Sequence, residues 1–230
     1  MLAAMVVIFN SSCSPEPEAE IAAYGDSVTW GYGALPGGWV TRLEARTGYE
    51  FTNLAVPGET AEGGSKRIAR ALKTAPNAAT VLLIHGGNDW VSIFRGDPCK
   101  SGCDPATVDH KYEHVRLHLR KMRNRIAESG KKVVFGQYWP TSPETCSRYK
   151  PENFVRYQEH RSYLNAKIQM VADEYGDAIV THDDMYEMDD TGANFFDCLH
   201  PSAKGYDLIA ERWLQDYEIW KPESKWMFEF

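Results

Sequence analysis

The sequence predicts one compact domain with a three-layer α/β/α architecture around a five-stranded parallel sheet. Short apolar runs alternate along the chain with longer segments whose apolar residues recur at helical spacing. Strands that alternate with helices favour a parallel sheet with helices on both faces. The 230 residues are 43% hydrophobic and 25% charged, a composition that suits a single domain with a substantial core.

The apolar runs are assigned as strands because each is short and is followed by turn residues. The strands are expected at residues 21–24, 49–55, 79–84, 132–136 and 178–181. Residues 81–84 are apolar at every position, as expected of a strand covered on both faces. Right-handed crossovers between such strands give the sheet order 2-1-3-4-5, which is the arrangement of flavodoxin-like folds.

The amphipathic segments between the strands are assigned as helices. They are expected at residues 39–47, 60–73, 107–129, 152–175 and 203–213. Gly48, Gly130 and Gly176 follow three of them, and glycine is the residue that most often ends a helix. Residues 90–106 and 141–151 are expected to be long loops, of which the first would form a wall of a binding site.

Polar or glycine-containing segments follow the first three predicted strands. Ser27 comes after the first strand, Gly58 after the second and Asn88 after the third. In the order 2-1-3 these strand ends lie side by side, so the three residues are expected to converge where open α/β sheets bind ligands. The N–H groups of Ser27 and Gly58 and the side-chain amide of Asn88 would then offer three donors to an oxyanion.

A serine nucleophile also needs a base, and a carboxylate that holds the base in the right tautomer. Asp197 and His200 are three residues apart, so one turn of chain can bring the carboxylate to the imidazole. Ser27, His200 and Asp197 are therefore the candidate nucleophile, base and orienting acid. Taken alone, Gly25-Asp26-Ser27 is equally compatible with an ordinary strand-to-loop turn.

These segments, in this order, resemble the sequence blocks of the SGNH hydrolases, also called GDSL-type esterases and lipases. The matching blocks are Gly25-Asp26-Ser27, Gly58, Gly86 to Asp89 and Asp197 to His200, within a resemblance that spans about residues 21–213. The resemblance implies a catalytic triad of Ser27, Asp197 and His200, and an oxyanion hole formed by Ser27, Gly58 and Asn88. Val28 stands where the first block commonly has leucine, and both residues are apolar.

The resemblance implies hydrolysis of carboxylic esters through an acyl-enzyme, with no metal or organic cofactor. A compact site without a long lid insertion favours short acyl groups, including acetyl groups on carbohydrate. Lysophospholipids and thioesters stay open as substrates, and so does transfer of the acyl group to an alcohol instead of water. The alternative from another class is a surface-anchored carbohydrate-binding protein, which would have no chemical need for the Asp197–His200 pair.

Aromatic residues are expected in the loops at the same edge of the sheet. Trp30, Trp90 and Trp139 are candidates for substrate binding, because indole rings can line an acyl pocket or stack on a sugar ring. The alternative is that these rings pack beneath the loops.

Residues 1–19 are expected to be a signal-like segment and linker, and residues 20–230 the single hydrolase domain. An apolar run over residues 1–9 precedes small residues and an acidic stretch, as in a secretory signal. The segment also resembles a bacterial lipoprotein signal, which implies a lipid anchor at Cys13. It departs from that pattern in lacking a basic start and in Asn10, so a mistaken start site or a flexible tail is the alternative.

Cysteine usage favours an exported protein, whether periplasmic, secreted or lipid-anchored. Apart from Cys13 the chain has four cysteines, an even number that suits two disulfides in an oxidising compartment. We expect the pairs Cys99–Cys103 and Cys146–Cys198. Other pairings stay open, as do buried free thiols in a cytosolic enzyme.

The formal net charge of −7, without a block of lysines or arginines, argues against nucleic acid and anionic membrane surfaces as partners. No stretch reaches the ~20 apolar residues of a spanning helix. The expected partner is therefore a small-molecule or glycan ester.

No metal site is expected. His110, His114 and His118 share a helix face, but the sequence places no carboxylate or cysteine clearly beside them. An acidic segment that suggests calcium lacks the spacing and the closing glutamate of an EF-hand loop; it contains Asp183, Asp184, Asp189 and Asp190.

Overall fold

The computed structural model describes residues 21–34, 37–96, 105–146, 149–185 and 192–222. Its sheet has five strands, all paired in parallel, in the order β2-β1-β3-β4-β5. The strands are β1 (Ile21–Gly25), β2 (Phe51–Asn53), β3 (Thr80–Ile84), β4 (Lys132–Gly136) and β5 (Ala178–Val180). The predicted sheet order is confirmed. The segment with Cys13 and the proposed Cys99–Cys103 pair lie outside the described residues.

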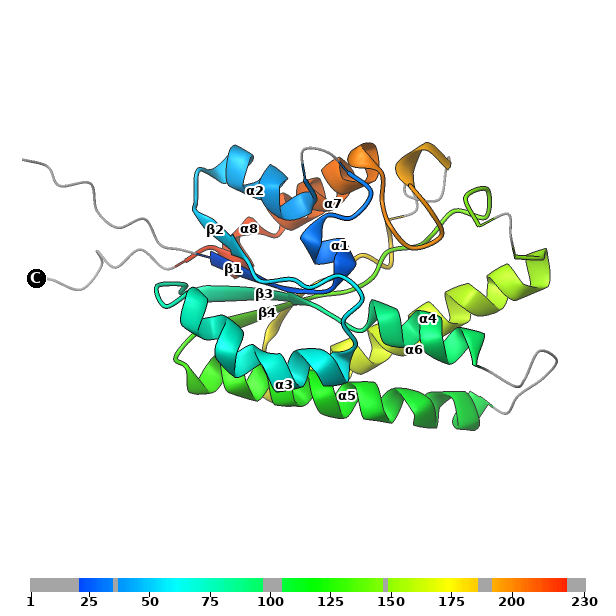
Figure 1. Cartoon of the computed structure of the whole chain (residues 1–230), viewed down its shortest axis with the longest axis horizontal. Coiled ribbons are helices and arrows are strands. Elements are labelled where there is room, and N and C mark those ends of the chain that lie inside the picture. The colour runs from blue at the N-terminus through cyan, green and yellow to red at the C-terminus, as the bar shows by residue number, and fades with distance from the viewer. Residues whose placement is uncertain (1–20, 35–36, 97–104, 147–148, 186–191, 223–230) are drawn as a thin grey trace, which may run out of the picture.

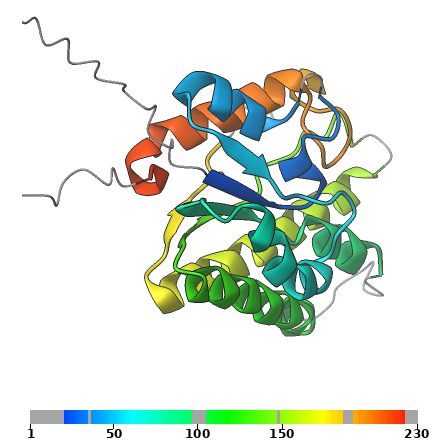
Figure 2. The same cartoon turned by 60° about the vertical axis from the view of Figure 1, so that its left-hand side comes forward.

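Helices cover both faces of the sheet, which confirms the three-layer prediction (Figures 1 and 2). One face carries α1 (Ser27–Trp30), α2 (Trp39–Thr47) and α7 (Ala203–Gln215), and α8 (Tyr217–Trp220) follows α7. The other face carries α3 (Ala61–Ala71), α4 (Gly87–Arg95), α5 (Pro105–Glu128) and α6 (Pro151–Tyr175). Short 3-10 turns lie at Leu72–Thr74 and Gly192–Asn194. Within the layers α2 packs on α7, α3 on α5, and α5 on α6.

β1 lies between β2 and β3, and all five of its residues are buried. Its register against β3 runs from Ile21 opposite Thr80 to Gly25 opposite Ile84. A Cβ atom at Gly25 would lie 2.2 Å from the carbonyl oxygen of Ile84, so a larger residue would push the two strand ends apart. The segments that follow β1 and β3 therefore leave the same edge of the sheet close together.

Helix α4 is the main difference from the sequence prediction, which placed a loop at residues 90–106. The chain turns into the helix at Gly86, whose φ of 110° lies in the left-handed region that favours glycine. Trp90 is fully buried and Phe94, one turn later, packs against the core. The helix thus forms because this apolar pair is covered by distant parts of the chain.

β2 is shorter than predicted and ends at Asn53, whose side chain fixes the loop that follows. Its side-chain amide donates to the carbonyl oxygen of Thr29 at 2.9 Å, and its Oδ1 accepts from the N–H of Ala55 at 3.1 Å. Thr60 accepts a hydrogen bond from the N–H of Gly63 and so caps α3 instead of starting it. The loop between β2 and α3 is therefore fixed at both ends.

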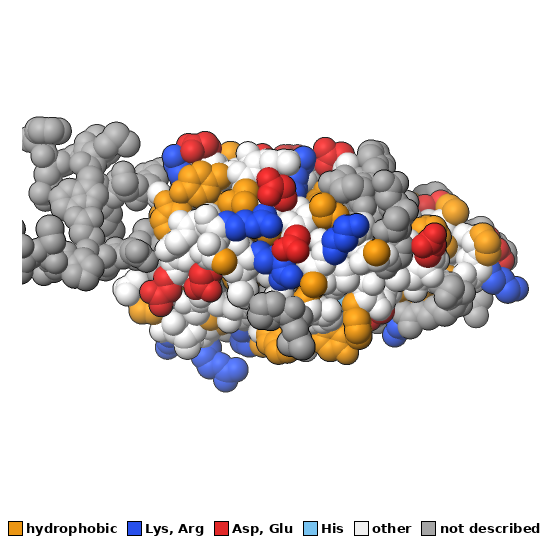
Figure 3. Space-filling model, turned by 90° about the horizontal axis from the view of Figure 1, so that it is seen from above, with side chains coloured by type: hydrophobic (Ala, Val, Ile, Leu, Met, Phe, Trp, Pro, Cys, Tyr) orange, Lys and Arg blue, Asp and Glu red, His pale blue; other side chains and the backbone are white. Residues whose placement is uncertain are grey.

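The face formed by α2 and α7 mixes basic and acidic side chains (Figure 3). Arg42 and Arg46 on α2 pair with Asp207 and Glu211 on α7. Among the described residues, no helix is long and apolar enough to cross a membrane.

Candidate active site

The residue after β1, Asp26, caps the short helix α1. Its Oδ1 accepts a hydrogen bond from the N–H of Val28 at 3.1 Å, the capping role typical of aspartate. Ser27 is thereby the first helical residue, and its side chain is almost buried. The N–H of Ser27 is one of the amides for which a helix provides no acceptor within its own first turn.

The second carboxylate oxygen of Asp26 joins the ends of β1, β3 and β4. Oδ2 accepts from the hydroxyl of Tyr138 at 2.7 Å and from the N–H of Gly87 at 3.1 Å. The same N–H lies 2.8 Å from Tyr138 Oη. Burial, together with the charge of Asp26, raises the pKa of Tyr138 well above its usual value, so the phenol stays protonated as a donor. This buried network fixes the backbone from which Ser27 and Asn88 project.

Ser27, His200 and Asp197 form one continuous series of hydrogen bonds. Ser27 Oγ lies 2.8 Å from His200 Nε2. On the other side of the ring, His200 Nδ1 lies 3.0 Å from Asp197 Oδ1 and 2.9 Å from Oδ2. The structure thus brings together three residues that are up to 173 positions apart in the chain.

The segment before α7 is folded around the carboxylate of Asp197. Asp197 Oδ1 accepts from the backbone N–H groups of Leu199 and His200 at 2.8 and 2.9 Å. Burial by itself raises the pKa of Asp197, but the hydrogen bonds from His200 and from these two N–H groups outweigh it and lower the pKa to about 2. Asp197 is therefore ionised near neutral pH and can hold Nδ1 of His200 in its protonated form.

A disulfide ties this segment to the loop after β4. Cys146 and Cys198 are bonded, with their Cα atoms 4.8 Å apart, which is the pairing expected from the sequence. The hydroxyl of Tyr157 on α6 also donates to the carbonyl oxygen of Cys198 at 3.2 Å. The loop after β4 and helix α6 thus both hold Cys198, which lies between Asp197 and His200.

Two of the three candidate oxyanion donors follow the ends of β2 and β3. Gly58 lies in the exposed turn between β2 and α3 with φ of 79°, a conformation that favours glycine. Asn88 lies in the first turn of α4, and its amide nitrogen donates to the carbonyl oxygen of Glu59 at 3.0 Å. A side-chain amide has two N–H groups, so this bond orients Asn88 and leaves a second hydrogen for a ligand.

Glu59, next to Gly58, is anchored by a cationic side chain that the sequence analysis did not single out. Arg67 donates to both carboxylate oxygens, at 2.7 and 2.6 Å, and His85 Nε2 lies 3.3 Å away. Burial raises the pKa of Glu59, but the hydrogen bonds from Arg67 and His85 prevail and lower it to about 2. This bidentate pair fixes the loop that presents Gly58.

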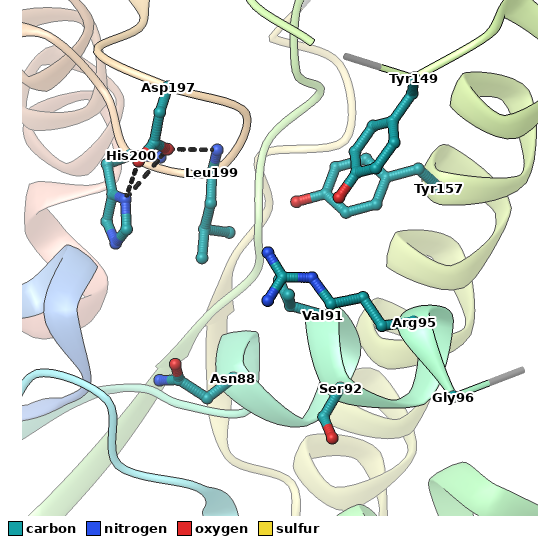
Figure 4. A pocket seen from close by; sticks show the side chains of 10 residues that line it. All are labelled: Asn88, Val91, Ser92, Arg95, Gly96, Tyr149, Tyr157, Asp197, Leu199 and His200. Atoms are coloured by element: carbon teal, nitrogen blue, oxygen red, sulfur yellow. Dashed lines mark hydrogen bonds and ion pairs between the residues drawn. The ribbon is translucent and has the colours of Figure 1, made fainter.

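A cavity of about 620 Å³ opens beside Asp197 and His200 (Figure 4). Its walls come from α4, from the start of α6 and from the Asp197–His200 segment, and the side chain of Arg95 points into it. Most lining side chains are polar or aromatic; the lining residues are Asn88, Val91, Ser92, Arg95, Gly96, Tyr149, Tyr157, Asp197, Leu199 and His200. Arg95, Tyr149 and Tyr157 could not be identified from the sequence. The first two lie in segments expected to be loops, and Tyr157 lies in an expected helix whose neighbours in space the sequence does not show.

The tryptophans proposed to bind substrate are placed differently from one another. Trp90 and Trp139 are 0% and 1% exposed, and Trp90 stacks on Tyr157 and donates to the carbonyl oxygen of that residue. Neither ring can touch a ligand in this structure, so the interpretation that they line the pocket is corrected: both rings are buried. Trp30 is 53% exposed at the end of α1 and stays a candidate.

The acidic segment after β5 is paired with basic side chains. Asp183 accepts from Arg161 and from the amide of Asn165, and Asp184 pairs with Arg212. Asp189 and Asp190 lie outside the described residues.

The model of the GDSL-like Lipase/Acylhydrolase family matches residues 23–208, a range that includes every candidate catalytic residue. Comparison with curated proteins gives no match.

Solved structures with the same fold resemble the chain over most of its length. A GDSL-like lipase from Bacteroides thetaiotaomicron is 17% identical, with a TM-score of 0.59, over 87% of this chain and 88% of that one. The psychrotrophic esterase EstA from Pseudoalteromonas sp. is 19% identical, with a TM-score of 0.61, over 87% and 97%. The acetyl xylan esterase AlAXEase is 15% identical, with a TM-score of 0.62, over 86% and 98%. At these identities the likeness establishes the fold.

Proposed function

The chain belongs to the GDSL-like Lipase/Acylhydrolase family, and we propose that it hydrolyses carboxylic esters with Ser27 as the nucleophile. The observation that carries the proposal is the series of hydrogen bonds from Asp197 through His200 to Ser27 Oγ. It stands beside a cavity that Asn88 and His200 both line. A nucleophile, a base and an orienting carboxylate in contact are the arrangement that acyl transfer to a serine requires.

In the first step, His200 Nε2 accepts the proton of Ser27 as Oγ attacks the acyl carbon. Asp197 keeps Nδ1 protonated and stabilises the imidazolium that forms. The imidazolium then gives its proton to the oxygen of the leaving alcohol, and an acyl ester on Ser27 remains. In the second step His200 deprotonates a water molecule that attacks this ester, and the proton returns to Ser27 as the acid is released.

The negative charge of each tetrahedral intermediate needs donors fixed in advance. We assign this role to the backbone N–H groups of Ser27 and Gly58 and to the free amide hydrogen of Asn88. Ser27 is held by the cap at Asp26, Gly58 by the Glu59–Arg67 pair and Asn88 by its bond to Glu59. Donors that are already fixed do not have to reorganise during the reaction, which is the basis of oxyanion stabilisation.

The cavity walls favour a short acyl group and a polar alcohol. A long acyl chain gains about 0.8 kcal/mol for each buried CH₂, but only where apolar surface receives it. The aliphatic side chains in the lining are those of Val91 and Leu199, while Arg95, Tyr149 and Tyr157 offer polar groups. We therefore propose acetyl or similarly short esters, including those of carbohydrates, as substrates; the acetyl xylan esterase named above is one protein of this fold that acts on such an ester.

Hydrolysis of p-nitrophenyl esters from acetate to palmitate tests both parts of this proposal. We expect the highest kcat/KM for the shortest chains and no turnover by Ser27→Ala. Ser92→Ala is the matched control, because Ser92 also lines the cavity, one turn after Asn88 on α4, but has no assigned role in proton transfer or oxyanion binding. Turnover retained by Ser27→Ala would refute the mechanism, and a maximum at long chains would favour a lysophospholipase or thioesterase.

We also propose that the protein is exported and folds as one domain from residue 20. The disulfide between Cys146 and Cys198 supports export, because such bonds persist in oxidising compartments. Fractionation of cells that express the full chain, with detection of lipid on Cys13, would distinguish a secreted protein from an anchored one.

A further inference from the structure

Two histidines and a glutamate meet on the surface between α3 and α5, on the opposite side of the sheet from α7 (Figure 1). One ligand atom from each of Glu62, His114 and His118 lies within 4.8 Å of the other two. His118 is nearly buried, Glu62 is half-buried and His114 is exposed. The carboxylate that the sequence analysis did not find beside the histidines therefore comes from the neighbouring helix.

The hydrogen bonds of Ser65 decide which nitrogen of His118 carries the proton. Ser65 Oγ donates to the carbonyl oxygen of Glu62 at 2.9 Å and lies 2.7 Å from His118 Nδ1. A hydroxyl has one hydrogen, so when Ser65 donates it to Glu62, its oxygen accepts from a proton on Nδ1 of His118. His118 Nε2 then carries no proton and has a free lone pair, and this is the atom that faces His114.

The spacing of the two imidazoles fits a tetrahedral metal ion. The Nε2 atoms of His114 and His118 are 3.2 Å apart. Two nitrogens bound to one zinc ion at 2.0–2.1 Å in tetrahedral geometry lie about 3.3 Å apart. The two side chains therefore need almost no rearrangement, apart from movement of the His114 proton from Nε2 to Nδ1.

The partner of His118 is of the kind that metal-binding histidines use. A histidine that binds a metal through one nitrogen usually donates from the other to a fixed acceptor, which orients the ring. Ser65 supplies this acceptor from α3, the same helix that carries Glu62. The site thus has three candidate ligands, and Ser65 orients one of them, His118.

Two cations oppose the binding of a metal here. Lys66 pairs with Glu62 Oε1 at 2.6 Å, and Lys121 lies near His118. The Lys66 ammonium is 73% exposed, and an exposed pair of this kind is weak and is easily replaced by a metal ion. These charges predict moderate affinity, and three protein ligands would leave the fourth position of a tetrahedral ion to water.

We propose that Glu62, His114 and His118 bind a zinc ion that links α3 to α5. Neutral imidazole together with one carboxylate is a ligand set that zinc accepts. α3 begins directly after the loop that carries Gly58, and the N–H of Ala61 at its start is bound by Asp89 at 2.7 Å. The ion would therefore stabilise the helix that follows the oxyanion loop, at a place separate from Ser27 and His200.

Calorimetric titration of the full chain with Zn²⁺, without an affinity tag and after removal of metals by a chelator, tests this proposal. We expect one zinc ion per chain, and an affinity at least about tenfold lower in His114→Ala and in Glu62→Gln. His110→Ala is the matched control, because this exposed histidine is one turn earlier on α5 and outside the cluster. It should bind zinc as the parent does.

Thermal unfolding provides a second readout that does not depend on catalysis. A ligand that binds only the folded state raises the unfolding temperature. Zinc should therefore raise that of the parent and of His110→Ala, and have little effect on His114→Ala. Equal zinc affinity in the parent and His114→Ala, or the absence of zinc binding by the parent, would overturn the proposal. His114 is exposed, so its variant should fold as the parent does in the presence of chelator.

Discussion

The hydroxyl of Tyr138 offers the sharpest test of how Ser27 is positioned. Tyr138→Phe removes a buried hydrogen bond of 2.7 Å to the carboxylate of Asp26 while keeping the ring. A hydrogen bond to a charged group contributes about 1.5–3 kcal/mol, and Asp26 Oδ2 would keep only the N–H of Gly87. We therefore expect a loss of about 2 kcal/mol in the free energy of unfolding.

For a chain of this length 1 kcal/mol corresponds to about 2–4 °C in Tm, so the expected decrease is about 4–8 °C. Differential scanning calorimetry of the parent and the variant measures it directly. Tyr163→Phe is the matched control, because Tyr163 contacts aromatic rings but its hydroxyl makes no hydrogen bond with the described residues. If Tyr138→Phe unfolds at the same temperature as Tyr163→Phe, the Asp26 network does not hold the strand ends together.

Three further changes test other parts of the site. Asn88→Ala should lower kcat by about 10²–10³-fold with little effect on folding. Ester hydrolysis by this variant is compared with that by Ser92→Ala, and an unchanged kcat would exclude Asn88 as an oxyanion donor. Because the pKa of Glu59 is about 2 in the folded protein against 4.5 ordinarily, its ion pair stabilises the fold above about pH 4.5 and loses this effect as pH falls towards 2. Urea unfolding at pH 5 and pH 3 should therefore show a larger loss for the parent than for Glu59→Gln, and parallel losses would contradict the pairing with Arg67. The double variant Cys146→Ser/Cys198→Ser removes a cross-link between residues 52 positions apart. Its free energy of unfolding in urea should be about 2–4 kcal/mol lower than that of the parent. Equal values would mean that the disulfide does not stabilise the fold.

Much of the candidate site could be predicted from the sequence, because several of its residues come directly after the ends of strands. Ser27 and Asn88 come just after short apolar runs, and parallel strands deliver such residues to one edge. Asp197 and His200 are close in sequence, so their contact is local. The sheet order followed from the same alternation of strands and helices.

Contacts between distant segments could not be predicted in the same way. α4 lacks a polar capping side chain, and its buried Trp90 depends on Tyr157, 67 residues later. Glu62 lies 52 positions before His114, so only the packing of α3 on α5 shows that the two meet. For Trp90 and Trp139 the sequence indicated the right edge of the sheet but not whether the rings lie above or below the loops.

Reaction with an organophosphate ester tests the central claim that Ser27 is the nucleophile most directly. The protein is incubated with diethyl p-nitrophenyl phosphate, and peptides are analysed by mass spectrometry. The account predicts one diethylphosphoryl group, located on Ser27, with loss of esterase activity in proportion to labelling and greatly slowed labelling in His200→Ala. Complete inactivation with the label on another residue, or full ester hydrolysis by protein labelled at Ser27, would contradict it.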